Sequence, residues 1–170
     1  MALAGYLASF KSIPGLTVKG HSMIASRKDG IDVIAFEQTC RAPRDSNNGC
    51  ATGRRSYLPV SFTACQGPEY PQLLQILDEN QAIQEMKFIF YMPRESGKLN
   101  MTGGKEYASL EYTFTTAHIA SLEMRQLNTT NPDLRQYEMY YTCTFVFEKI
   151  SCDFKNNAST SMTAAWSEVK

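Results

Sequence analysis

The stretch that decides the fold is GPEYPQLLQILDENQAIQEMKFIFY, residues 67–91. Its first part carries apolar residues at positions i, i+3, i+4 and i+7, which predicts an amphipathic helix. Four residues form the predicted packing face of this helix: Tyr70, Leu73, Leu74 and Leu77. From Met86 onward the pattern alternates with a period of two, which is typical of a strand. A short helix that runs directly into an aromatic strand indicates a helix laid against a sheet.

Strand-like alternation recurs along most of the remaining chain. It predicts strands over residues 3–10, 16–24, 31–39, 57–63, 110–114, 117–127 and 137–154. In the last of these the apolar set moves from odd to even positions near residues 148–149, which indicates either a bulge or a strand buried on both faces. Polar connections are expected at residues 26–30 and 93–104, and a polar tail at 156–163. Many strands and one helix favour a β-barrel or a tightly packed sandwich.

One long segment, CRAPRDSNNGCATGRRS at residues 40–56, shows no periodicity. Loops of this length inside a compact domain are usually functional, although a mobile hairpin tip without a role has the same composition. The sequence alone leaves both interpretations open.

Composition narrows the class of protein. The formal net charge is zero, which gives no indication of nucleic-acid binding or of an anionic membrane partner. No apolar run approaches the ~20 residues that span a bilayer, and the N-terminus has no basic leader, so neither membrane insertion nor a cleaved signal peptide is expected. Five cysteines without close pairing favour reduced thiols in a cytoplasmic protein.

The sequence offers no catalytic, cofactor or metal site. The two histidines, His21 and His118, lack the spacing of metal ligands. A thiol hydrolase that uses Cys65 or Cys143 is disfavoured, because both lie in apolar strand patterns where a small buried hydrophobe is the simpler interpretation. The Gly-Gly-Lys at residues 103–105 lacks the context of a phosphate loop. We therefore expect a protein that is not an enzyme.

Taken in order, several segments resemble the Hcp tube proteins of bacterial type VI secretion systems. The matching segments are IDVIAFEQ (31–38), TGRRSYLPVSFT (52–63), PEYPQLLQIL (68–77), EMKFIFY (85–91) and NPDLRQYEMYYTCTFVFEKI (131–150). A late Trp166 also fits the family's short tail element. The resemblance covers the chain from about residue 16 onward.

The resemblance implies a single tube domain over residues 1–170, built as a two-sheet β-barrel with one α-helix packed against it and assembling as a ring. Hcp proteins form homohexameric rings that stack into a tube, which a contractile sheath propels with a spike protein at its tip. Some hold effector proteins in the lumen. They assemble in the bacterial cytoplasm and leave through the type VI system without a cleaved signal peptide.

The resemblance also gives the long loop, at about residues 41–56, a role in contacting the adjacent ring. Seven residues form the expected ring-stacking loop: Pro43, Arg44, Asp45, Asn47, Asn48, Arg54 and Arg55. Its charges of both signs suit a head-to-tail self-contact.

Two other interpretations fit parts of the sequence. A ligand-binding barrel of the lipocalin or streptavidin type would line a cavity with aromatic residues such as Phe88, Phe90, Tyr112 and Phe145. A phage-like tail-tube protein would share the logic of ring assembly.

Overall fold

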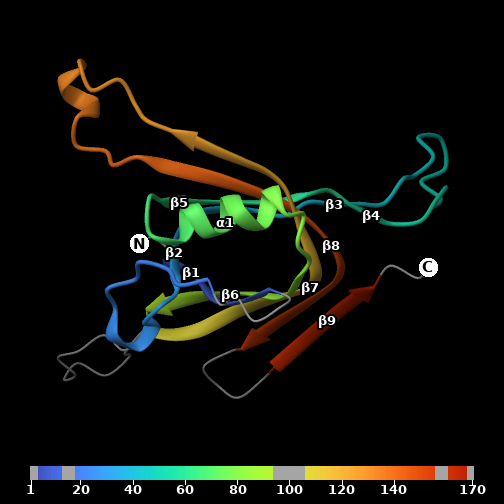
Figure 1. The fold of residues 1–170 in the computed structure, drawn as a ribbon. Coiled ribbons are helices and arrows are strands. Elements are labelled where there is room, and N and C mark those ends of the chain that lie inside the picture. The colour runs from blue at the N-terminus through green and yellow to red at the C-terminus, as the bar shows by residue number, and fades with distance from the viewer. Residues whose placement is uncertain (1–3, 13–17, 94–105, 156–160, 168–170) are drawn as a thin grey trace, which may run out of the picture.

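The computed structural model describes residues 4–12, 18–93, 106–155 and 161–167 (Figure 1). Seven antiparallel strands form one sheet in the order β5-β2-β1-β6-β7-β8-β9. These strands are β1 (Ala4–Ser12), β2 (Ile31–Glu37), β5 (Val60–Cys65), β6 (Ile83–Pro93), β7 (Glu106–Arg125), β8 (Tyr140–Lys155) and β9 (Ser161–Ser167). Two short strands, β3 (Cys40–Arg41) and β4 (Ser56–Tyr57), make a separate pair.

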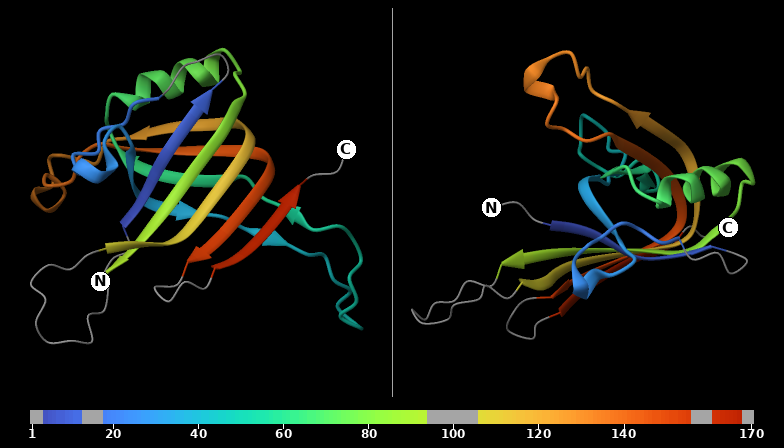
Figure 2. Two further views of the ribbon diagram at one scale, coloured as in Figure 1. Left: turned by 90° about the horizontal axis from the view of Figure 1, so that it is seen from below. Right: turned by 60° about the vertical axis from the view of Figure 1, so that its left-hand side comes forward.

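The sheet closes on itself through a second pairing of β8. One edge of β8 pairs with β7, while its other edge pairs with β5 along one part and with β9 along another. Pairing from Val60↔Phe145 to Cys65↔Tyr140 closes the barrel, and β9 continues the sheet beyond it. Figures 1 and 2 show two curved layers, and the paired strands β7 and β8 bend from one layer into the other. The expected mostly β barrel is confirmed, with its two layers joined into one hydrogen-bonded sheet.

A bend in β7 allows one strand to serve both layers. Thr116 has a φ of 53°, and the β7–β8 register shifts between Ile119 and Ser121. The two strands expected at 110–114 and 117–127 are therefore one bent strand. In β8 the change of apolar phase lies opposite this bend, and the β7–β8 pairing keeps its register there, from Thr115↔Lys149 to Ala117↔Phe147. The irregularity is in β7, and not near residues 148–149 of β8.

Aromatic side chains fill the interior of the barrel. Phe62, Phe88, Phe114 and Phe145 are almost completely buried. The rings of Phe88 and Phe145 are nearly parallel with centroids 6.0 Å apart, and Phe114 meets Phe145 edge-on at 5.1 Å. Such contacts stabilise a core beyond the burial of their area.

The helix α1 (Glu69–Asp78) lies across the barrel, as predicted, but one residue of its expected face is wrong. Leu73 is fully buried, and Tyr70 and Leu77 pack partly buried against the core. Leu74 is 48% exposed, whereas Ile76, which was not expected, is buried. Leu73–Ile76 and Leu74–Leu77 are both i, i+3 pairs, so the spacing of apolar residues does not decide which pair faces the core. In the structure the helix is rotated so that Leu73 and Ile76 face inward.

Two other sequence expectations differ from the structure. Residues 18–24 form no strand; Gly20 and Ser22 instead donate their backbone amides to the nearby Asp29 and Gly30 carbonyls at 2.9 and 3.0 Å. A Cβ at Gly20 would overlap the Gly30 carbonyl oxygen, so this close approach needs glycine. The short 3₁₀ helix η1 (Ala25–Arg27) follows.

The expected polar tail contains the start of β9, and the connection at 93–104 falls almost entirely outside the described residues.

Candidate functional site

The segment between β2 and β5 forms an arm, which we define as residues 40–57. Its base is the two-stranded pair β3–β4, with Cys40 opposite Tyr57 and Arg41 opposite Ser56. Beyond the base, a single bridge joins Arg44 to Ala51. The arm projects away from the barrel, at the opposite end from the β7–β8 connection (Figures 1 and 2).

The tip of the arm is held by its own polar groups. The Asp45 amide donates to the Cys50 carbonyl and the Gly49 amide to the Asp45 carbonyl, each at 2.9 Å. The Asp45 carboxylate accepts from the Asn47 amide, and the Asn48 side-chain oxygen accepts from the Cys50 amide, also at 2.9 Å. Three of the expected loop residues therefore shape the turn.

The arm carries mostly positive charge on an exposed surface. Its charged residues are four arginines and one aspartate: Arg41, Arg44, Arg54, Arg55 and Asp45. The arginines and Pro43 are exposed, as are Asn47 and Asn48. The Arg44 guanidinium donates to the Gly49 carbonyl at 3.1 Å, so it supports the tip. Arg54 and Arg55 lie on the returning side, next to the base.

Three aromatic rings meet at the base of the arm. The Tyr57 ring centroid lies 4.3 Å from that of Trp166 in β9 and 5.8 Å from that of Phe147 in β8. Phe147 and Trp166 are 6.3 Å apart and nearly perpendicular. Phe147 also meets the core residue Phe114 at 4.9 Å. We call Tyr57, Phe147 and Trp166 the base cluster. Its members are partly buried and connect the arm to the core.

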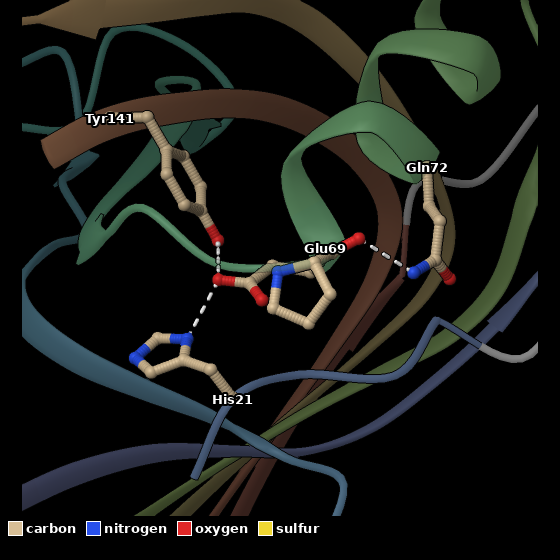
Figure 3. A network of polar contacts seen from close by, with 5 residues as sticks. His21, Glu69, Gln72 and Tyr141 are labelled. Atoms are coloured by element: carbon tan, nitrogen blue, oxygen red, sulfur yellow. Dashed lines mark hydrogen bonds and ion pairs between the residues drawn. The ribbon is translucent and has the colours of Figure 1, made fainter.

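A buried polar network at the start of α1 was not expected from the sequence. Glu69 is fully buried, and its Oε1 atom lies 2.8 Å from His21 Nδ1 and accepts a hydrogen bond from the Tyr141 hydroxyl at 3.2 Å (Figure 3). Burial, together with the charge of Glu69, raises the pKa of Tyr141, so its hydroxyl stays protonated and donates. The network ties α1 to the segment before β2 and to β8.

Gly67 is packed against this carboxylate. A Cβ built at Gly67 would overlap Glu69 Oε2 and would lie 2.6 Å from His21 Nδ1. The Glu69 Oε2 atom is buried and has no hydrogen-bond partner among the described residues. Because the carboxylate is enclosed so tightly, we interpret this network as positioning α1 and not as a ligand site.

The described residues contain no group of three or more His, Cys, Asp or Glu side chains that could hold a metal ion. In the same part of the chain, no helix has the length and apolar character needed to cross a membrane.

The cysteines differ sharply in accessibility. All five are free thiols; Cys50 is exposed at the arm tip, whereas Cys143 is buried, and burial raises its pKa to about 12. At neutral pH we expect a maleimide reagent to modify Cys50 rapidly and Cys143 only after unfolding, because the thiolate is the reactive form. Mass spectrometry of the labelled protein would measure this. Equal rates for both thiols in the folded protein would contradict the prediction.

The family model described as "Type VI secretion system effector, Hcp" matches residues 10–154. The chain belongs to the Hcp family. The match spans most of the sequence and includes the arm, α1 and the strands from β2 to β7 in full. Hcp-family proteins are components of the type VI secretion system. They assemble there as oligomers and are secreted through it. This chain is a type VI secretion tube or effector protein.

Solved Hcp structures share the fold of this Hcp-family chain. One, described as "Crystal structure of Hcp protein", has a TM-score of 0.81 at 15% identity and covers 99% of this chain and 100% of its own. A doubly substituted Hcp1 from E. coli EAEC 042 has a TM-score of 0.76 at 21% identity, with 97% and 99% covered. A secreted Hcp3 from Pseudomonas aeruginosa has 0.70 at 15%, with 98% and 100% covered. No curated protein matches the chain.

Membership of the family leaves the two other interpretations unfavoured. A ligand-binding barrel would need an open interior, whereas Phe88 and Phe145 are buried in contact with each other inside this one. Phe90 and Tyr112 border an apolar surface groove of about 480 Å³ that also includes Ile34 and Met92. The match to the Hcp model likewise does not favour a phage-like tail-tube protein.

Proposed function

We propose that the chain is a single tube domain, residues 1–170, that assembles into homohexameric rings and that these rings stack into the inner tube of a type VI secretion system. In this role it has no catalytic activity, no cofactor, no nucleic-acid partner and no direct insertion into membranes. Its partners are other copies of itself, the spike protein, the contractile sheath and effectors held in the lumen. It assembles in the cytoplasm and is then secreted without a cleaved signal peptide.

The observation that carries this proposal is a closed barrel that still exposes large apolar side chains and has an arm at one end. Ile34 on β2 is 62% exposed and Met162 on β9 is 71% exposed. Val146 and Phe154 on β8 are also exposed. The barrel core is already filled, so these side chains contribute nothing to it, and they suit lateral contacts between subunits. The outer edge of β9, at the end of the strand order, supplies a further self-contact.

Sedimentation velocity tests the ring. At micromolar concentration we expect the purified protein to sediment as a species several times larger than the 19.1 kDa subunit. Electron microscopy of the same sample should show rings with an open centre. A 19.1 kDa species alone over that concentration range would overturn the proposal.

We further propose that the arm mediates stacking of rings and does not close them. Arg54→Glu combined with Arg55→Glu should leave ring mass unchanged while tube formation and secretion are lost, because each exposed ion pair contributes only about 0.2–1 kcal/mol but is repeated around every ring. The matched control reverses two exposed lysines outside the arm, in the connection between β1 and β2, as Lys19→Glu with Lys28→Glu, and should stack normally.

Two results would contradict the role of the arm. If the arginine variant dissociates to monomers, the arm lies in the lateral contact. If it still forms tubes and is exported, the arm has no part in stacking.

A further inference from the structure

The arm joins the barrel through a break in strand pairing. The β2–β5 ladder ends at Glu37↔Ser61, and the arm's own ladder begins at Cys40↔Tyr57 in a separate sheet. A backbone hydrogen bond from the Leu58 amide to the Thr39 carbonyl, at 3.0 Å, spans this break. Pro59 lies within it and has no amide hydrogen to donate. We call this junction, residues 38–39 and 58–59, the hinge.

Beyond the hinge the arm is internally ordered. The Arg44↔Ala51 bridge, the Thr52 amide bonded to the Pro43 carbonyl at 3.0 Å and the tip hydrogen bonds hold its two sides together. An arm held together in this way would turn about its base as one body, and a small change of angle at the base would displace the tip by a larger distance. A contact made by the tip then depends on whatever fixes the angle at the base.

The base cluster lies at the point where that angle is set. Tyr57 is the last residue of the arm before the hinge, and its ring packs against Trp166 at 4.3 Å and Phe147 at 5.8 Å. Phe147 is anchored to Phe114 in the core. Beside the cluster lies a hollow of about 280 Å³, which Arg55 and Leu58 also line. That hollow gives the base room to shift when an aromatic ring is removed.

We infer that Trp166, from the C-terminal strand, is a positioning residue that sets the direction of the stacking arm by bracing Tyr57. The inference rests on the proposed role of the arm in stacking. It assigns to β9 a function in stacking as well as in extending the sheet: the strand holds the arm at the angle from which its arginines meet the next ring. Loss of the brace should weaken stacking without removing any charge from the arm.

The first test compares Trp166→Ala with Trp166→Phe. The alanine variant should keep its ring mass and need at least about tenfold more protein to form tubes, since every subunit loses the ring contacts of Trp166 with Tyr57 and Phe147. The phenylalanine variant, which keeps an aromatic ring against Tyr57, should return to within about twofold of the parent. Thr163→Ala, at an exposed position on the same strand but opposite Asp153 and away from the cluster, is the matched control and should not change stacking.

The second test changes Tyr57, the arm residue in the Trp166–Tyr57 contact. Trp166 is the single tryptophan of the chain, so its emission reports on the cluster alone. Tyr57→Ala should shift that emission to longer wavelength in isolated rings and weaken stacking to the same degree as Trp166→Ala. Because both side chains act through one contact, the double variant should be no worse than either single variant.

Several outcomes would overturn the inference. Normal stacking by Trp166→Ala and Tyr57→Ala would show that the base cluster does not direct the arm, even if reversal of Arg54 and Arg55 blocks stacking. Additive losses in the double variant would show two separate roles, and dissociation of Trp166→Ala rings would show that Trp166 acts in ring closure and not in directing the arm. Where Trp166→Ala fails to fold, Tyr57→Ala alone decides. Normal stacking after arginine reversal would instead refute the proposed role of the arm.

Discussion

Replacement of Leu73 by alanine should lower the free energy of unfolding by about 2–5 kcal/mol. Leu73 is completely buried on the face of α1 that packs into the barrel, so the substitution removes apolar contacts and leaves a cavity in the core. Urea denaturation followed by circular dichroism would measure the loss, and rings should be compared at one fixed protein concentration because assembly adds to apparent stability.

The adjacent residue provides the control. Leu74→Ala makes the same chemical change one position along the helix, where the side chain is 48% exposed, and should cost only about 0.5 kcal/mol. Similar losses for the two variants would mean that α1 is rotated differently in solution. A large effect of Leu74→Ala on ring mass alone would place that residue in a contact between subunits.

Removal of the His21 side chain should cost about 3 kcal/mol, because among the described residues it leaves the buried Glu69 carboxylate with Tyr141 as its remaining hydrogen-bond donor. Glu69→Gln neutralises the carboxylate at nearly constant size. In that background the His21→Ala substitution should cost much less, and a double-mutant cycle should give a coupling energy of about 1–3 kcal/mol.

The same denaturation experiment measures this cycle. The other histidine of the chain, His118, provides the control, because it lies in β7 opposite Val146 of β8 and takes no part in the network at Glu69. His118→Ala should therefore cost the same in the parent and in the Glu69→Gln background. A coupling energy near zero for His21 would show that His21 and Glu69 stabilise the fold independently.

Local patterns in the sequence identify much of the fold. Alternation of apolar and polar residues predicts β2, β5 and β6 close to their observed positions, and β8 with one change of phase, because the alternating residues place one face against the core. Asn80 ends the helix region with a φ of 47°, as its residue type indicates. Local patterns do not predict β9, because the segment around Met162 is short, small and polar, and its pairing with β8 is what makes it a strand.

What the sequence does not reveal depends on long-range contacts. Glu69 is separated by many residues from both His21 and Tyr141, and a charged residue in the first turn of a helix is ordinarily expected to be exposed. The sequence shows the arm as a segment without periodicity. The base cluster, however, joins residues of the arm, β8 and β9, which meet only in the folded chain. Its contact with another ring is still a proposal.

The division of one β8 edge between β5 and β9 has a consequence for how the protein is made. Closure of the barrel joins Val60–Cys65 to a strand that the ribosome makes only after β6 and β7. Until β8 emerges, Phe62 and Phe88 have no partner ring at Phe145 and remain accessible to other nascent chains. Contacts so distant in sequence close slowly. A cell that makes many copies at once therefore benefits from chaperones that shield the unfinished barrel before subunits meet one another.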